Sequence, residues 1–400
     1  MEKHYTEEFL ILLVSSFAFC TLGYLLILQA KKSHGGLLRK ILYVPSRKST
    51  TGAVLLGGLP LACTVILSYL ALLYFEDFRE FFLFSERYLI KYWLMGSFFF
   101  VVYGHLDDKY ELKPIVKLGF QFLGVFIFSF LSSKVVWPDN STIAFIVLSV
   151  WGLGVVNGAN LLDGLDTLAI KLFSAIYLTF MALGFFYGNS AVILGSLVSA
   201  VPLLAFLYFN KEPAKIHLGE IGGSFLGYSF LLLSAILFNS LKFKYFHFRA
   251  MSISLIPLTL PMVELVTSFL RRVYNKKSPF SGDKLHVHYI LKNEYNFSAT
   301  LIADIMSLFY LLTGLSAITI TYIIHPLWAL IFHIFVVTGV YYSIGKKKWK
   351  GLDTIELNPK NILNFMQKRK IHLIDSAAID NFNITIEPNQ RKKSHDEDAA

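Results

Sequence analysis

Two adjacent carboxylates, Asp107 and Asp108, stand at the end of an apolar run of the sequence. Repulsion between two neighbouring carboxylates can raise the pKa of one of them toward the range of a useful general base. The pair therefore predicts acid–base chemistry at a membrane surface. A solvated loop flank is the ordinary alternative for two adjacent acids.

Lys117 and Gln121 follow just inside the next apolar run. Pro114 suits the first turn of a helix, which places Lys117 and Gln121 one turn apart on the same helix face. The helix dipole adds partial positive charge at this end. Together these features predict a phosphate site beside the two acids. For Lys117 alone, a side chain that anchors the helix at the interface is the alternative.

A second polar cluster, "NGANLLDGLDTLA", ends another apolar run. Asn157, Asn160 and Asp163 recur at every third position, which predicts that they share one helix face. Polar groups inside a membrane are costly and are functional by default. Amides and carboxylates suit a hard cation or the hydrogen-bonding edges of a nucleotide, and Asp166 adds a further acid after Gly164. Hydrogen bonding between helices would explain the two asparagines but not the two acids.

Glycines surround a single acid, Glu220, in the stretch "HLGEIGGSFLG". Backbone amides at a glycine-rich helix start can bind phosphate. A carboxylate there would repel the phosphate unless a metal ion lay between them. Gly219, Gly223 and Gly227 are spaced four apart, which is typical of close helix packing. Packing explains the glycines and leaves Glu220 without a role.

The stretch "DKLHVHYIL" supplies two histidines, His286 and His288, close to Asp283 and Lys284. A zinc site would need more histidine or cysteine ligands than these connections supply. We interpret the pair as binding diphosphate oxygens or carrying a proton. A pair of interface histidines without a functional role is the alternative.

Long apolar stretches separate these clusters. Of the 400 residues, 55% are hydrophobic and 16% charged, whereas about 25% are charged in a typical soluble domain. The sequence predicts an all-α, polytopic membrane protein of about 11 transmembrane helices. Residues 1–345 are expected to form one transmembrane catalytic domain, and residues 346–400 a cytoplasmic tail with a disordered end. The predicted spans centre near residues 18, 64, 97, 124, 150, 178, 200, 231, 261, 311 and 334.

The basic residues are distributed unevenly between the two sets of connections. Of the 37 Lys and Arg residues, 29 fall on one side and eight on the other, which predicts an outside N-terminus and a cytoplasmic C-terminus. All the polar clusters then lie on the cytoplasmic side. Because the net charge of +10 mostly reflects topology, we expect no nucleic-acid partner, and the residual field would attract anionic substrates.

Four motifs occur in a recognisable order: "GHLDDKYELKPIVKLGFQ", "NGANLLDGLDTLA", "FNKEPAKIHLGEIGGSFLG" and "SPFSGDKLHVHYIL". From about residue 45 to residue 291, the chain resembles the polyprenyl-phosphate N-acetylhexosamine-1-phosphate transferase superfamily (glycosyltransferase family 4). The motifs are more similar to those of bacterial undecaprenyl-phosphate GlcNAc-1-phosphate transferases than to those of the phospho-N-acetylmuramoyl-pentapeptide transferase.

The resemblance implies an enzyme that transfers an N-acetylhexosamine 1-phosphate from a UDP-sugar to a polyprenyl phosphate, with Mg²⁺ as cofactor and UMP as product. It implies that Asp107 and Asp108 are catalytic, and that Asn160 and Glu220 hold the metal. The expected substrate-binding residues are Lys117, Asn157, Asp163, Asp166, His286 and His288.

The chain departs from the family pattern at several positions. Glu220 and Gly223 replace the Asp and Ser of the usual "GDxGS" motif, and Tyr289 replaces the third histidine of "HxHH". Further departures are Thr50 for His, Thr167 for Gly and Glu264 for Asp. Since most charges are kept, we expect an active enzyme with a changed sugar preference.

The sequence thus predicts a multi-pass enzyme of the bacterial inner membrane that starts a cell-envelope glycan, with its active site facing the cytoplasm. We expect Asp107 to deprotonate the lipid phosphate, which attacks the sugar-bearing phosphorus; a covalent aspartyl-phosphate route is the alternative. A secondary transporter of an anionic solute and an inactive scaffold of the same fold are the alternative functions. A homodimer is compatible with the sequence, which leaves the sugar, the lipid length and the pathway open.

Overall fold

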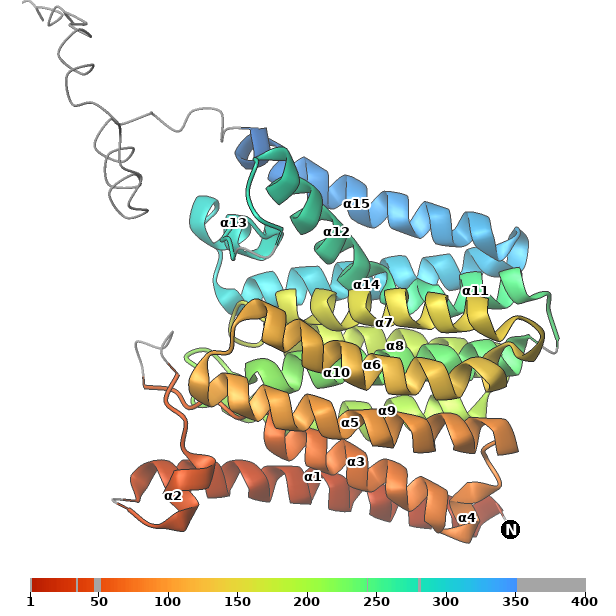
Figure 1. Cartoon of the computed structure of the whole chain (residues 1–400), viewed down its shortest axis with the longest axis horizontal. Helices are drawn as coiled ribbons and strands as arrows, with labels where there is room; N and C mark the ends of the chain where they lie inside the picture. The colour runs from red at the N-terminus through yellow and green to blue at the C-terminus, as the bar shows by residue number, and fades with distance from the viewer. Residues whose placement is uncertain (1, 34, 47–51, 243, 280–281, 351–400) are drawn as a thin grey trace, which may run out of the picture. The chain divides into compact units, whose positions relative to one another are not determined.

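The structure, a computed structural model, describes residues 2–33, 35–46, 52–242, 244–279 and 282–350 (Figure 1). The predicted disordered tail end and Thr50 lie outside these residues. Within them the only β pairings are two isolated bridges, which join Val54 to Pro45 and to Ile216. The helices are α1 (Glu2–Lys32), α2 (Leu37–Leu42), α3 (Gly58–Tyr74), α4 (Glu76–Arg79), α5 (Phe84–Tyr110), α6 (Pro114–Val136), η1 (Pro138–Asn140), α7 (Ser141–Leu161), α8 (Leu168–Tyr187), α9 (Ser190–Asn210), α10 (Gly219–Leu241), α11 (His247–Leu255), η2 (Ile256–Leu258), α12 (Thr259–Tyr274), α13 (Val287–Glu294), α14 (Ala299–Ile323) and α15 (Pro326–Lys350).

The predicted all-α polytopic architecture is confirmed. In the described part of the chain, ten helices are long and apolar enough to cross a membrane, and α3 is a shorter apolar helix of 17 residues. Each of the eleven predicted centres falls within one of these segments. The ninth span is interrupted, because η2 separates α11 from α12 at Pro257, which lacks a backbone N–H. The hydroxyl of Tyr310 contacts the carbonyl oxygens of Ile256 and Pro257 at 3.2 and 2.7 Å.

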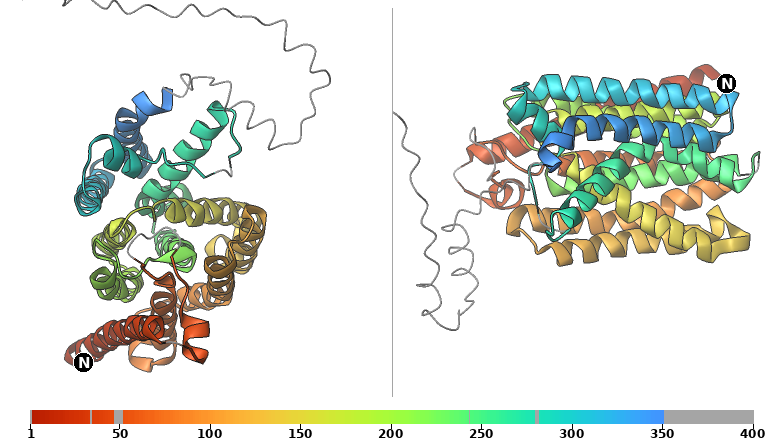
Figure 2. Two further views of the ribbon diagram at one scale, coloured as in Figure 1. Left: turned by 90° about the vertical axis from the view of Figure 1, so that its left-hand side faces the viewer. Right: turned by 90° about the horizontal axis from the view of Figure 1, so that it is seen from above.

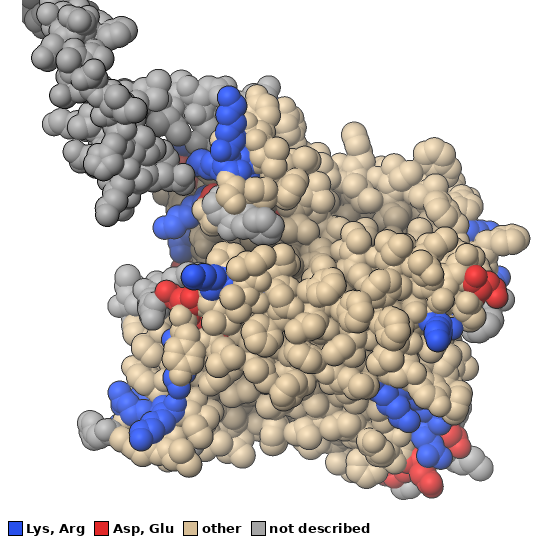
Figure 3. Space-filling view, viewed as in Figure 1, with Lys and Arg blue, Asp and Glu red and all other residues tan. Residues whose placement is uncertain are grey.

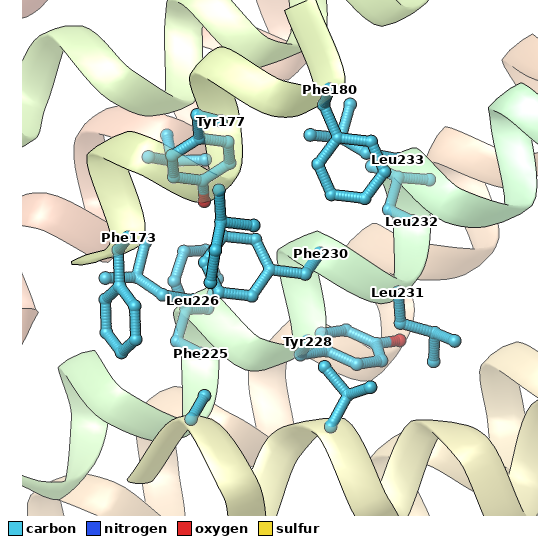
Figure 4. Close-up of a cluster of buried hydrophobic side chains, with 14 of the residues drawn as sticks. Phe173, Tyr177, Phe180, Phe225, Leu226, Tyr228, Phe230, Leu231, Leu232 and Leu233 are labelled. Carbon is cyan, nitrogen blue, oxygen red and sulfur yellow. The ribbon is translucent and has the colours of Figure 1, made fainter. Parts of the chain in front are cut away.

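Helix α10 lies at the centre of the bundle, and the whole of its apolar stretch is buried (Figure 2). Helices α3, α5, α7, α8 and α9 pack around it. Figure 4 shows aromatic side chains of α8 and α10 in this core, where the Phe230 ring lies 5.4 Å from that of Phe173 and 4.9 Å from that of Tyr177. The position of α10 is therefore set by the helices around it.

Charged side chains gather at the two ends of the helical bundle. On the face shown in Figure 3, Lys, Arg, Asp and Glu lie at the left and right margins, and the broad band between them shows none of these charged residues. The left end carries α2 and α13 and is called the α13 end; the right end carries α4 and is called the α4 end (Figure 1). This distribution is the one expected of helices that cross a bilayer.

The start of α10 is held tightly at the α13 end. A Cβ atom added to Gly58 of α3 would lie 2.1 Å from the backbone nitrogen of Gly222, and one added to Gly104 of α5 would lie 2.7 Å from the Cα of Ile221. The segment before α10 is also tied to the segment before α3, because His217 donates its backbone N–H to the Val54 carbonyl at 2.8 Å. These contacts fix the position of the next residues of α10.

The topology can be tested with cysteines introduced at exposed positions. Lys109 and Lys215 are exposed at the α13 end, and Lys244 is exposed at the α4 end. Because the basic asymmetry predicts that the α13 end faces the cytoplasm, a membrane-impermeant maleimide applied to intact cells should label Lys244→Cys only. A permeant maleimide should label all three variants.

The unchanged chain gives the background for this labelling, since Cys20 is buried and Cys63 is half-buried. Labelling of Lys109→Cys and Lys215→Cys by the impermeant reagent would show that the α13 end faces outward, opposite to the predicted orientation.

Candidate active site

Lys117 lies between two carboxylates that come from different helices. Its Nζ is 2.6 Å from Oδ2 of Asp107 and 3.3 Å from Oε1 of Glu220. The other oxygen of Glu220, Oε2, accepts a hydrogen bond from Nδ2 of Asn160 at 2.7 Å. Asp107, Lys117, Asn160 and Glu220 form what we call the carboxylate–lysine cluster, at the α13 end. The Lys117 and Glu220 side chains are 27% and 23% exposed, so the cluster is open to a substrate.

Helices α5 and α6 contact each other through two residues on each helix, and the two residues lie one turn apart. Pro114 occupies the first turn of α6, as predicted. Lys117 and Gln121 do share one face, since Lys117 contacts Asp107 and Gln121 donates to the hydroxyl of Tyr103 at 3.0 Å. The turn between the two helices is closed by the Leu112 N–H, which donates to Oδ1 of Asp107 at 2.7 Å.

Asp108 has a different neighbour from Asp107. Its Oδ1 accepts the backbone N–H of Glu220 at 2.9 Å, so it caps the start of α10. Gly219 has φ +75°, and a Cβ atom added to it would lie 2.6 Å from Oδ2 of Asp108. Glycine is therefore needed there for both its backbone conformation and its small size. Although the two acids were predicted as one catalytic pair, only Asp107 contacts Lys117.

The end of α7 places one predicted residue in the cluster and two outside it. Asn160 lies in the last turn and binds Glu220, whereas the side chain of Asn157 donates to the Leu153 carbonyl of its own helix at 2.8 Å. The prediction that Asp163 shares this helix face was wrong, because α7 ends at Leu161. The three-residue spacing continued past the point where the helix stops.

The replacement of serine by Gly223 is explained by Asn160. A Cβ atom added to Gly223 would lie 2.8 Å from Oδ1 and 3.3 Å from the Cα of Asn160. Gly227, one turn later, packs against α7 with an added Cβ only 2.8 Å from the Cα of Val156. Helix packing therefore accounts for these two glycines, while Gly219 serves the turn.

Asp166 connects two loops at the α13 end. Its Oδ2 accepts the backbone N–H of Ala214 at 3.0 Å, and its Oδ1 lies 3.5 Å from Nδ1 of His217. The next residue, Thr167, has φ +65°, a conformation that favours glycine, and its N–H donates to Oδ1 of Asn210 at 2.8 Å. Thr167, which replaces the family glycine, thus keeps a backbone conformation that favours glycine. Contact of Asp163 and Asp166 with a nucleotide stays a prediction.

His286 belongs to a second charged group beside α13. Its Nδ1 lies 2.5 Å from Oε1 of Glu264, and its Nε2 lies 3.4 Å from Oδ1 of Asp283. Arg271 and Arg272 contact the carboxylate of Asp283 at 2.8 and 3.2 Å. Burial alone would raise the pKa of Asp283, but the neighbouring Arg271 outweighs it, so the pKa lies below the usual value and the residue is ionised.

His288 is fully buried, and neither of its ring nitrogens has a hydrogen-bond partner. It packs under the preceding loop, since a Cβ atom added to Gly164 would lie 2.2 Å from its Nε2. Burial lowers the pKa of His288 to about 3, so the ring is neutral. Tyr289, which replaces the third family histidine, donates its hydroxyl to the Gly164 carbonyl at 3.1 Å. Substrate contact by His286 and His288 stays a prediction.

Four charged residues of this second group were absent from the predicted site: the buried Glu264, Arg271 and Arg272, and the half-buried Asp283. A signal for Glu264 was present in the sequence, since an acid within an apolar span is functional by default. The partners of Arg271 and Asp283 follow only from the folded loop.

The carboxylate–lysine cluster has the donor chemistry that a magnesium ion requires. Asp107 and Glu220 already converge on one positive charge, Nζ of Lys117, and Asn160 adds an amide beside them. Mg²⁺ is usually bound through one or two carboxylates together with water and substrate phosphates. In the described residues no three His, Cys, Asp or Glu side chains are grouped closely enough to hold a metal without such help.

Comparison with known proteins adds independent information. The family described as "Glycosyl transferase family 4" matches residues 90–238. A "Probable undecaprenyl-phosphate N-acetylglucosaminyl 1-phosphate transferase" of Bacillus subtilis (strain 168) is 33% identical over 211 residues, which are 49% of this chain and 56% of that relative. An "Undecaprenyl-phosphate alpha-N-acetylglucosaminyl 1-phosphate transferase" of Thermotoga maritima is 31% identical over 251 residues, 62% of this chain and 74% of the relative.

A "Phospho-N-acetylmuramoyl-pentapeptide-transferase" of Dictyoglomus turgidum is 34% identical over 148 residues, 33% of this chain and 48% of that relative. The chain therefore spans about half the length of the Bacillus and Dictyoglomus relatives (56% and 48%). The Thermotoga relative is matched over most of its length.

The geometry predicts that Asp108 stabilises the fold through the start of α10. Asp108→Ala should lower the free energy of unfolding by about 1 kcal/mol, the usual effect of a lost cap. Asp108→Asn should retain most of the stability, because its amide oxygen can still accept the Glu220 N–H. Unfolding in detergent micelles measures both changes.

Lys109→Ala is the matched control, since Lys109 is the exposed neighbour of Asp108 on the same helix turn. An Asp108→Ala variant as stable as this control would show that the cap is dispensable.

Proposed function

Because the chain belongs to glycosyl transferase family 4, the family that its four motifs resemble, we propose that it is a phosphoglycosyl transferase. It would move an N-acetylhexosamine 1-phosphate from a UDP-sugar to undecaprenyl phosphate. The names of the relatives support this reaction. The structural observation that carries the proposal is Lys117, held by carboxylates of α5 and α10 at the end of an apolar bundle.

The reaction makes one bond and breaks one. An oxygen of the lipid phosphate attacks the phosphorus that bears the sugar, the phosphoanhydride bond breaks, and UMP leaves. Asp107 accepts the proton of the lipid phosphate and is held for this by the Leu112 N–H. Lys117 then donates to the lipid phosphate, since an entering phosphate competes with the two carboxylates for its ammonium group. Direct attack needs no covalent enzyme intermediate.

Asn160 and Glu220 are the residues that would hold Mg²⁺. When bound, the ion would withdraw charge from the diphosphate as the anhydride bond breaks. Asn160 fixes the orientation of the Glu220 carboxylate through its hydrogen bond to Oε2. The second carboxylate oxygen, Oε1, is oriented by Lys117.

The proposed location is the inner membrane of a bacterium, with the α13 end facing the cytoplasm. The excess of basic residues at that end supports this orientation. The lipid phosphate would enter from the bilayer and the UDP-sugar from the cytoplasm. A transporter is expected to bind its solute near the middle of the membrane, whereas this cluster lies where α5 and α7 end and α6 and α10 begin.

The proposed reaction is tested by UMP release from UDP-N-acetyl sugars. Release should require both polyprenyl phosphate and Mg²⁺, and Asp107→Asn should reduce turnover by about 10²- to 10⁴-fold, the usual contribution of a positioned base. Binding of the UDP-sugar should change little, because asparagine keeps the shape and the acceptor for the Leu112 N–H.

Asp304→Asn is the matched control for this substitution, since Asp304 lies on α14 and makes an exposed ion pair with Lys171. Its turnover should equal that of the parent. Release of UDP in place of UMP would contradict the proposed reaction. Near-normal turnover of Asp107→Asn would show that Asp107 is not the base.

The role of Glu220 is tested by its metal dependence. Glu220→Gln should raise the Mg²⁺ concentration needed for half-maximal UMP release or abolish turnover. An amide has one acceptor oxygen and cannot serve both Asn160 and Lys117 as the carboxylate does. Glu220→Asp keeps the charge and should retain metal-dependent activity.

Glu212→Gln controls for the loss of a negative charge, because Glu212 is an exposed acid in the connection that leads to α10. If Glu220→Gln showed the Mg²⁺ titration and rate of this control, Glu220 would not be a metal ligand.

A further inference from the structure

The last helix of the described chain, α15, continues past its candidate membrane span and contacts the loop of residues 282–286, which we call the histidine loop. Nε1 of Trp349 donates to the backbone carbonyl of Leu285 at 3.1 Å. The guanidinium of Arg271 lies over the same indole, 5.6 Å from its centre. Trp349 lies past the apolar part of α15, which ends at Lys346. The segment predicted to begin a tail at residue 346 therefore continues as helix and touches the second charged group.

The local sequence lets the indole take this position. Gly345 stands one turn before Trp349, and a Cβ atom added to it would lie 2.3 Å from the indole ring. A second contact joins the same elements, since Nζ of Lys348 lies 2.9 Å from Oε1 of Glu294 on α13. A tryptophan among lysines at the end of a span is ordinarily an interfacial anchor. Here its only polar hydrogen is used by the histidine loop.

The two partners of Trp349, the Leu285 carbonyl and Arg271, are each one step from His286. Leu285 directly precedes His286, and Arg271 holds Asp283, whose carboxylate faces Nε2 of His286. Glu264 holds the other ring nitrogen. Loss of the indole would release both the Leu285 carbonyl and the guanidinium that holds Asp283, while the contact between Glu264 and His286 would remain.

We propose that Trp349 is a positioning residue that holds the histidine loop in the arrangement needed to bind the diphosphate of the donor substrate. The proposal rests on the proposed function for its substrate. It assigns to the end of α15 a task in donor binding that acts through Leu285 and Arg271. The expected effect is on the KM for the UDP-sugar, because the lipid phosphate is activated at the separate carboxylate–lysine cluster.

The test combines a measurement on the loop with a kinetic one. In Trp349→Ala, hydrogen–deuterium exchange of the peptide that covers residues 282–291 should be about tenfold faster, since a hydrogen bond and a cation–π contact are lost together. The KM for the UDP-sugar should rise by a similar factor, with kcat within about twofold of the parent, because the groups at the reacting atoms are unchanged.

Trp349→Phe separates the two contacts. Phenylalanine keeps a ring for Arg271 but has no N–H for the Leu285 carbonyl, so the effects should be about fivefold. Trp328→Ala is the matched control, because Trp328 is a 60% exposed tryptophan at the other end of the same helix. It should leave both exchange of the histidine loop and the KM unchanged.

Each remaining outcome has a definite meaning. Unchanged loop exchange in Trp349→Ala, or faster exchange with an unchanged KM, would overturn the positioning role. A fall in kcat together with a loss of stability, at an unchanged KM, would also overturn it, because this result would indicate a general packing defect. If the parent released no UMP while the loop still loosened in Trp349→Ala, the proposed function would fail and the contact would be supported by exchange alone.

Discussion

The close packing of the start of α10 against α3 and α5 is the constraint on which the site depends. The first N–H groups of a helix have no partner within it and need an acceptor from elsewhere in the fold. Asp108 supplies the acceptor, and Gly219, with its positive φ, allows the chain to pass directly over that carboxylate. Once this turn is fixed, Glu220 can only face α6 and α7. The cap and the active site are therefore consequences of one turn.

The same constraint separates the roles of the two adjacent acids. Successive residues of a helix point about 100° apart, so Asp107 and Asp108 cannot both face Lys117. One faces the cation of α6, and the other faces the backbone of α10. Replacing the family aspartate by Glu220 fits this arrangement, because the longer side chain reaches both Asn160 and Lys117, and Gly223 leaves room beside Asn160.

The site joins two charged groups whose charges are neutralised in different ways. In the carboxylate–lysine cluster one cation holds two acids, whereas beside α13 two arginines hold Asp283 and a histidine holds Glu264. The loop after α7 connects them, since Asn160 belongs to the first group and Gly164 packs on His288 beside the second. The lipid phosphate of the acceptor at one group and the diphosphate of the donor at the other would together use both.

The sequence by itself determined the spans, the helix start at Pro114 and the family, because hydropathy, proline geometry and motif order are local properties. It misplaced Asp163, since a three-residue spacing carries no sign that the helix stops at Leu161. Only the tertiary structure decided that Asp108 is a cap, that His288 is buried and that Trp349 reaches the histidine loop. Each of these depends on a partner distant in the chain, and a partner's position is set by packing of whole helices, which no local pattern encodes.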